Sequence, residues 1–76
     1  MINLEELKSL SEVLEKATAQ GDRVNVILDG GQSYSGKVKK NDANFYSIIE
    51  ISGKEFYDVM FRLDKVIAIE VRARDH

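Results

Sequence analysis

The feature that most constrains the fold is the alternation of apolar and polar residues between Arg23 and Ser52. At its start, the apolar residues Val24 and Val26 occupy every second position, which is the period of a half-buried strand. Two clusters of turn-forming residues, at 29–31 and 41–44, interrupt the alternation. The segment therefore predicts three strands joined by two tight turns. Because one face of this meander is strongly apolar, another element must cover it.

The second and third strands of the meander differ in their faces. Tyr34, Gly36 and Val38 share one face of the second strand, and serine and lysine residues occupy the other. The third strand, over 45–51, is largely apolar on both faces. A strand of this kind is typical of a position that is covered on both sides.

Length and composition limit the kind of protein. The chain has 76 residues and no cysteine, which predicts one domain with a small core and neither a disulfide nor a thiolate metal site. The net charge of −2 argues against general nucleic-acid binding but leaves room for a small local site. Without a leader-like segment or a membrane-length apolar run, we expect a cytoplasmic protein with no membrane partner. Self-association would add the stability that a small core lacks.

The segment from Asn3 to Gln20 predicts a helix, because leucine and alanine recur at spacings of three and four. Asn3 and Glu6 form a capping-box-like pair at its start, and Gly21 is expected to end it. We expect the apolar stripe to pack on the strands. The alternative is a partner-binding or membrane-surface helix, but the polar face lacks the excess of lysine and arginine of a membrane-surface helix. The stripe consists of Leu4, Leu7, Leu10, Leu14 and Ala17.

Two further strands follow the meander. A turn at Gly53 leads into a fourth strand over 55–63, which is apolar on both faces. A short connection at 64–65 leads into a fifth strand over 66–71. Left unpaired, either of these strands would be an exposed sheet edge, which is an aggregation hazard.

The expected fold class is mainly β: an N-terminal α-helix followed by a five-stranded, strongly bent antiparallel small barrel. One domain would span residues 1–76, with the helix at about 3–20 and the barrel at about 22–74.

The sequence carries no motif for catalysis, metal binding or nucleotide binding. The only histidine is His76, the last residue. Gly30 and Gly31 lie in a predicted hairpin and not between a strand and a helix, so they indicate turn chemistry and not a phosphate loop. We therefore expect no enzymatic activity, no cofactor, no metal and no small-molecule substrate.

Two stretches of the chain follow the motifs of a known family. The first combines the apolar alternation from Val24 with Gly31, Gly36 and Asp42, and the second is the run 61–66, in which an arginine precedes the turn into the last strand. Both resemble the motifs of the Sm-like (LSm/Hfq-like) family, and the resemblance covers nearly the whole chain. It implies an Sm-like fold and a homo-oligomeric ring of roughly five to eight subunits, in which the fourth strand of one subunit pairs with the fifth strand of the next.

The resemblance also implies a partner, single-stranded RNA that is U- or A-rich, bound near the central pore. In the family, bases stack on one residue, are hydrogen-bonded by an asparagine and are covered by the arginine of the second motif. These positions correspond to Asn44, Tyr46 and Arg62, so the aromatic and amide types are exchanged in this chain. Leu63 stands where the family has glycine. Lys65 completes the expected RNA-binding set, while Gly31, Gly36 and Asp42 are expected to serve the fold.

Several of these residues have an alternative role. Tyr46 would instead pack between strands, and Asn44 would be a turn residue that tolerates left-handed backbone geometry. Asp42 lacks its family partner, which favours a structural role in the turn. The basic cluster either contacts phosphates or is a solvated face that guards a strand. Its residues are Lys37, Lys39 and Lys40, with Arg72 and Arg74 expected beside them.

Two functions follow from these observations. The first is an Sm-like ring that binds single-stranded RNA, as an RNA chaperone or in RNA processing. The alternative is a protein-assembly scaffold of the same fold that has lost the RNA-base pocket. The acidic balance and the exchanged pocket residues favour the scaffold, whereas the nearly complete motif frame favours RNA. We expect RNA binding.

Overall fold

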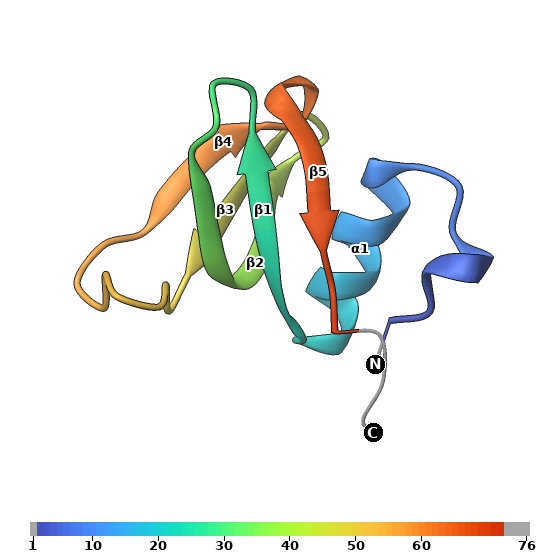
Figure 1. Ribbon diagram of the computed structural model, residues 1–76, viewed down its shortest axis with the longest axis horizontal. Coiled ribbons are helices and arrows are strands. Elements are labelled where there is room, and N and C mark those ends of the chain that lie inside the picture. Colours follow the sequence, from blue (N-terminus) through green and yellow to red (C-terminus); the bar gives the residue numbers. More distant parts are fainter. Residues whose placement is uncertain (1, 73–76) are drawn as a thin grey trace.

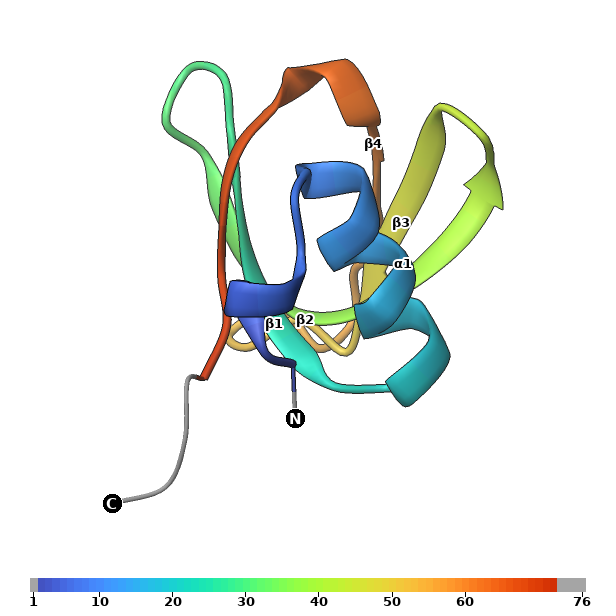
Figure 2. The ribbon, with the colours of Figure 1, turned by 90° about the vertical axis from the view of Figure 1, so that its right-hand side faces the viewer.

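A strongly curled sheet of five antiparallel strands, with a helix lying across its open side, makes up the computed structural model (Figures 1 and 2), which describes residues 2–72. The predicted fold class, one N-terminal helix followed by a bent five-stranded antiparallel sheet, is confirmed, and the sheet forms a half-barrel. The elements are the 3-10 turn η1 (Leu4–Glu6), α1 (Leu10–Gln20), β1 (Arg23–Leu28), β2 (Ser33–Asp42), β3 (Phe45–Ile49), β4 (Val59–Arg62), the 3-10 turn η2 (Leu63–Lys65) and β5 (Val66–Glu70).

The order of the strands in the sheet is β4-β3-β2-β1-β5, which leaves β4 and β5 at the two edges. They are consecutive along the chain, and η2 joins them by crossing from one edge of the curled sheet to the other (Figure 2). In a five-stranded antiparallel sheet the two outer strands run in the same direction. They therefore cannot close the barrel by antiparallel pairing with each other.

The core lies between the concave face of the sheet and helix α1. Leu14, Val26 and Ile48 are fully buried at its centre. Leu7 and Leu10 are partly buried and pack against this cluster, so the predicted packing of the helical stripe on the sheet is confirmed for them. Leu4 is the exception, since it is 46% exposed.

The predicted start of the helix is wrong. Asn3 caps only the short turn η1, where its side-chain oxygen accepts a hydrogen bond from the backbone N–H of Glu5 at 3.1 Å. The α-helix begins after Ser9, whose hydroxyl accepts the N–H of Glu12 at 3.2 Å, while the Glu12 carboxylate accepts the N–H of Lys8 at 2.7 Å. These two hydrogen bonds start the helix after Ser9 and compete with a continuous helix across residues 7–9. The predicted end at Gly21 is confirmed by its left-handed φ of 71°.

The third and fourth strands are shorter than predicted. Tyr46, Ser47 and Ile48 are all buried, as expected of a strand covered on both sides, but β3 ends at Ile49 and not at 51. The next residue, Glu50, has a φ of 51°, which an extended strand does not allow. Residues 52–58 form turns and loop, so β4 begins at 59 and not at 55.

Strand β2 is the bent strand that holds the half-barrel together. Its first half pairs with β1 and its second half pairs with β3. The pairing partner changes at Lys37, which pairs with both strands. Gly36, immediately before this point, is so close to β3 that a Cβ atom would lie 2.4 Å from the carbonyl oxygen of Ile49. The expected structural role of Gly36 therefore has a direct cause, the close approach of two backbones. Gly31 has a φ of 95° in the β1–β2 turn, which favours glycine there.

Candidate nucleic-acid interface

One end of the β3–β4 pair brings together Asn44 and Arg62, two of the predicted RNA-binding residues. Phe45, the first residue of β3, pairs with Arg62, the last residue of β4. Next to them, the backbone N–H of Leu63 donates to the carbonyl oxygen of Asn44 at 2.8 Å, which ties the β2–β3 turn to η2. These contacts create a surface hollow of about 360 Å³. It is lined by Asn44, Phe45, Arg62 and Asp64.

Arg62 and Asp64 form an exposed ion pair in this hollow. Nη2 of Arg62 lies 2.7 Å from Oδ2 of Asp64, and the two side chains are 57% and 61% exposed. An exposed pair of this kind contributes at most about 1 kcal/mol. A ligand that offers better contacts can therefore compete for either group.

Phe45 is the aromatic residue of this surface, and sequence reasoning missed it. It is 39% exposed, beside Arg62 on the neighbouring strand. Successive side chains of a strand point to opposite faces, so an inward Tyr46 requires an outward Phe45. This alternation was the signal in the sequence, whereas the resemblance to the Sm-like family pointed to Tyr46.

Tyr46 lies in the core and not on this surface. Its side chain is 1% exposed, and its ring stacks on that of Phe61. Burial, with a smaller contribution from the negative charge of Glu15, raises the pKa of the Tyr46 hydroxyl above its ordinary value. This position fits the packing role that the sequence left open for Tyr46.

A second hollow, also lined by Arg62, includes Lys65. The backbone carbonyl of Lys65 accepts the N–H of Asp29 at 2.7 Å, which joins the start of β5 to the β1–β2 turn. Arg62 thus lines both hollows, one with Asn44 and the other with Lys65. The lining residues of the second hollow are Leu28, Asp29, Gln32, Tyr34, Met60, Phe61, Arg62 and Lys65.

Asp42 makes a local contact in the turn that precedes Asn44. Its carboxylate accepts the backbone N–H of Ala43 at 2.8 Å. The contact fits the structural turn role expected of Asp42.

The basic cluster on β2 is partly neutralised by glutamates. Lys37 Nζ lies 3.7 Å from a carboxylate oxygen of Glu50, and Lys40 Nζ lies 3.8 Å from one of Glu15. Lys39 is exposed. These ion pairs reduce the positive charge that the cluster offers to a phosphate.

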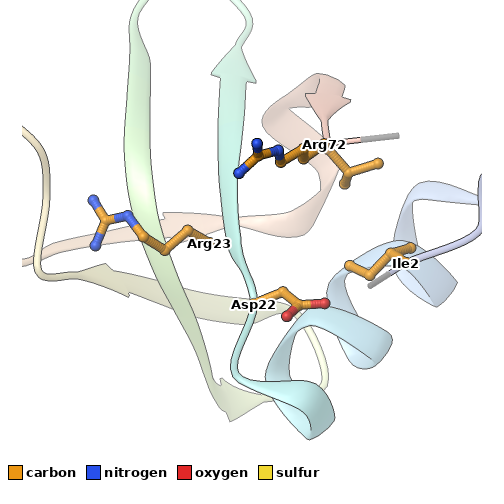
Figure 3. Close-up of a pocket in the computed structure, with 5 residues that line it drawn as sticks. Ile2, Asp22, Arg23 and Arg72 are labelled. Atoms are coloured by element: carbon orange, nitrogen blue, oxygen red, sulfur yellow. The ribbon is translucent and has the colours of Figure 1, made fainter. Parts of the chain in front are cut away.

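Arg72 lies at a further hollow, close to both ends of the described chain (Figure 3). There the guanidinium of Arg23 points away from Asp22, and it donates a hydrogen bond to the Ser52 hydroxyl at 2.8 Å. None of the expected RNA-binding residues lines this hollow, and Arg74 and His76 lie outside the described residues. The lining residues are Ile2, Asp22, Arg23, Val71 and Arg72.

Within residues 2–72, no three histidine, cysteine, aspartate or glutamate side chains gather as they would around a metal ion. In the same part of the chain, no helix is both long and apolar enough to cross a membrane. Comparison of the sequence and the structure with family models, characterised proteins and solved structures found no match. The geometry of this chain is therefore the basis on which a function is proposed.

Proposed function

We propose that this protein assembles into a homo-oligomeric ring of the Sm-like kind that binds single-stranded RNA at Asn44, Phe45, Arg62 and Lys65. The observation that carries the proposal is the strand order β4-β3-β2-β1-β5, which leaves two open sheet edges with Arg62 at the end of one of them. Assembly through these edges would repeat the Arg62 surface once in every subunit.

The two edges are suited to pairing between copies. In the described part of the chain, β4 pairs with β3 alone and β5 with β1 alone, so each has a free row of backbone groups. Each edge also carries a large exposed apolar side chain, Met60 on β4 (60% exposed) and Ile67 on β5 (59% exposed). A head-to-tail contact between β4 of one copy and β5 of the next removes both edges when the ring closes.

The chemistry around Arg62 supports RNA as the ligand. Single-stranded RNA is recognised by stacking of its bases on aromatic rings and guanidinium planes, and by hydrogen bonds to base edges. Phe45 and Arg62 supply the stacking surfaces, the Asn44 amide supplies hydrogen bonds, and Lys65 supplies a charge for phosphate. Because the chain has a net charge of −2, binding depends on several subunits contacting one strand. We expect it to weaken with salt.

The scaffold is the second candidate, favoured by two observations. Tyr46 is buried, which leaves its ring unavailable for stacking on a base, and Arg62 already has a carboxylate partner in Asp64. A ring that used its edges only to hold copies together would need neither Tyr46 nor Arg62 on its surface.

One experiment distinguishes the two functions. The mass in solution is measured by light scattering at micromolar protein, alone and with short uridine-rich, adenine-rich and guanosine-containing RNAs at low salt. The proposal predicts a discrete oligomer of roughly five to eight chains that gains mass with RNA. A monomeric mass would refute the ring, and an intact ring that binds none of the RNAs would establish the scaffold instead.

A further inference from the structure

We infer that the hollow at Asn44, Phe45, Arg62 and Asp64 selects guanine, and that the carboxylate of Asp64 is the group that selects it. The inference rests on the proposed RNA binding and adds a base preference to it. It differs from the U- or A-rich preference that the family resemblance implies.

The position of Asp64 makes its carboxylate available to a ligand. It belongs to η2 and lines the hollow, and its side chain is 61% exposed. Arg62 contacts one oxygen, Oδ2, at 2.7 Å, and this contact orients the carboxylate within the hollow. The other oxygen, Oδ1, makes no hydrogen bond to any residue between 2 and 72. Each carboxylate oxygen accepts two hydrogen bonds, so both retain an acceptor site for a ligand.

The hydrogen-bonding pattern of the bases then decides which of them fits. An ionised carboxylate only accepts hydrogen bonds. Guanine presents two adjacent donors, N1–H and the 2-amino group, which match the two oxygens of one carboxylate. Uracil presents a single N–H between two carbonyl oxygens, and adenine presents its amino group next to a ring nitrogen acceptor. When uracil or adenine occupies the hollow, the carboxylate of Asp64 faces at least one acceptor of the base. The repulsion between the two acceptors weakens the binding of these two bases.

The other three residues complete the requirements of a guanine. Its 6-carbonyl oxygen needs a donor, which the Asn44 side-chain amide supplies. Its two fused rings offer a large stacking surface to the exposed ring of Phe45, and the Arg62 guanidinium supplies a second planar partner. The Arg62–Asp64 pair keeps the hollow electrically neutral, so a neutral base meets no excess charge in it.

The test compares bases in RNAs of one length. Fluorescence anisotropy with the full-length protein at fixed low salt uses labelled strands of about nine nucleotides, in which guanosine alternates with uridine. Matched strands replace the guanosines by inosine, adenosine or uridine. Inosine lacks the 2-amino group but keeps the N1–H and the 6-carbonyl. We expect the guanosine strand to bind about fivefold or more tightly than the uridine and adenosine strands, with inosine between them.

Two matched variants test the role of Asp64. Asp64→Asn removes the carboxylate and should abolish the preference for guanosine over uridine. Asp58→Asn makes the same change of charge at an exposed position that does not line the hollow, and should keep the preference. The ratio of the two affinities is the readout, because the loss of one negative charge strengthens binding to every RNA. Circular dichroism checks that both variants are folded.

Each outcome has one meaning. A guanosine preference that is lost in Asp64→Asn and kept in Asp58→Asn supports the inference. Equal or tighter binding of the uridine or adenosine strand overturns the inference and leaves the proposed RNA binding intact. A guanosine preference that survives in Asp64→Asn overturns the role of Asp64. If no strand binds, the proposed RNA function fails, and the inference fails with it.

Discussion

The ring of Tyr46 stacks on the ring of Phe61 inside the core, with the ring centroids 6.3 Å apart and the ring planes inclined by 20°. The two residues are cross-strand partners on β3 and β4. The adjacent cross-strand pair, Phe45 and Arg62, has the opposite orientation and faces the surface. The packing of one aromatic pair inside the half-barrel therefore fixes which residues are available to a ligand outside it.

The buried hydroxyl of Tyr46 should make the protein less stable in alkali. Its pKa is raised above 10.0 by burial and by Glu15, so above that pH the folded state binds more protons than the unfolded state. The free energy of unfolding should therefore fall as the pH rises from about 10, until the folded pKa is passed. Tyr46→Phe removes this contribution and should show a shallower fall between about pH 9 and pH 11 in urea denaturation. Tyr57→Phe, at a 66% exposed position, is the control, and equal slopes for both variants would contradict the prediction.

Leu14 should contribute more to stability than Leu10. Leu14 is 0% exposed, whereas Leu10 is only partly buried at the margin of the core. Leu14→Ala should lower the free energy of unfolding by about 2–5 kcal/mol, because it removes buried methyl groups and leaves a cavity. Leu10→Ala should cost less, since its site is open to solvent on one side. Urea denaturation of both variants measures the difference, and an equal loss would mean that helix α1 packs differently on the sheet.

Gly36 should not tolerate a side chain. A Cβ atom there would lie 2.4 Å from a backbone oxygen of Ile49, and a backbone atom cannot move aside without bending β3. Gly36→Ala should therefore cost about 3 kcal/mol, at the upper end of the usual range for overpacking. Gly21→Ala should cost about 1 kcal/mol, because nothing lies within 4 Å and only the left-handed backbone opposes the change. If the two variants are equally stable in denaturation experiments, the two strands can separate at Gly36.

The open sheet edges should control assembly. Met60→Lys on β4 and Ile67→Lys on β5 place a charge at the two proposed contacts, and each should reduce the mass measured by light scattering to that of a monomer. Both side chains are exposed, so circular dichroism should remain that of a folded chain. Ile67 is suitable because it is exposed, whereas Ile69 on the same strand is 9% exposed and belongs to the core. Leu4→Lys, at an exposed apolar residue on neither edge, should keep the wild-type mass. An unchanged mass in both edge variants would exclude β4–β5 pairing.

Arg62 should be the main contributor to RNA affinity. Arg62→Ala removes a stacking surface and a positive charge from every subunit, and should weaken binding about tenfold or more without changing the oligomer mass. Arg62→Lys keeps the charge but loses the planar guanidinium, so it should rescue affinity only in part. Anisotropy and light scattering on the same samples measure both properties. If Arg62→Ala binds RNA with wild-type affinity, the RNA-binding surface lies elsewhere on the molecule.

Lys39 should have a small, non-specific effect. It is exposed on β2, and its neighbours Lys37 and Lys40 are paired with glutamates. Lys39→Ala should therefore lower the affinity slightly and make its dependence on salt less steep. A large loss of affinity would indicate that RNA also follows β2.

Much of the fold was predictable from the local sequence. The errors in the prediction also have local causes. The five strands, their order along the chain and the end of the helix at Gly21 follow from two-residue alternation and turn residues, which act over a few positions. The predicted start of the helix was wrong because the Ser9 hydroxyl caps the N–H of Glu12 inside the expected helix, and the Glu12 carboxylate accepts the N–H of Lys8. The predicted fourth strand was too long because it included residues 55–58. These residues are apolar in part but lie in the loop, where Phe56 is 95% exposed.

The sequence by itself determined the class of fold, because apolar spacing and turn chemistry are properties of neighbouring residues. The resemblance to the Sm-like family suggested Asn44, Tyr46, Arg62 and Lys65 as candidates, although it could not show which of them meet. Only the tertiary structure decided that Tyr46 faces the core and Phe45 the surface, since that depends on which face of β3 turns toward the core. It likewise decided that Arg62 reaches Asp64 beside Asn44 and that β4 and β5 are left as open edges. These relationships depend on cross-strand register and on the curvature of the sheet, which residues distant in sequence set together.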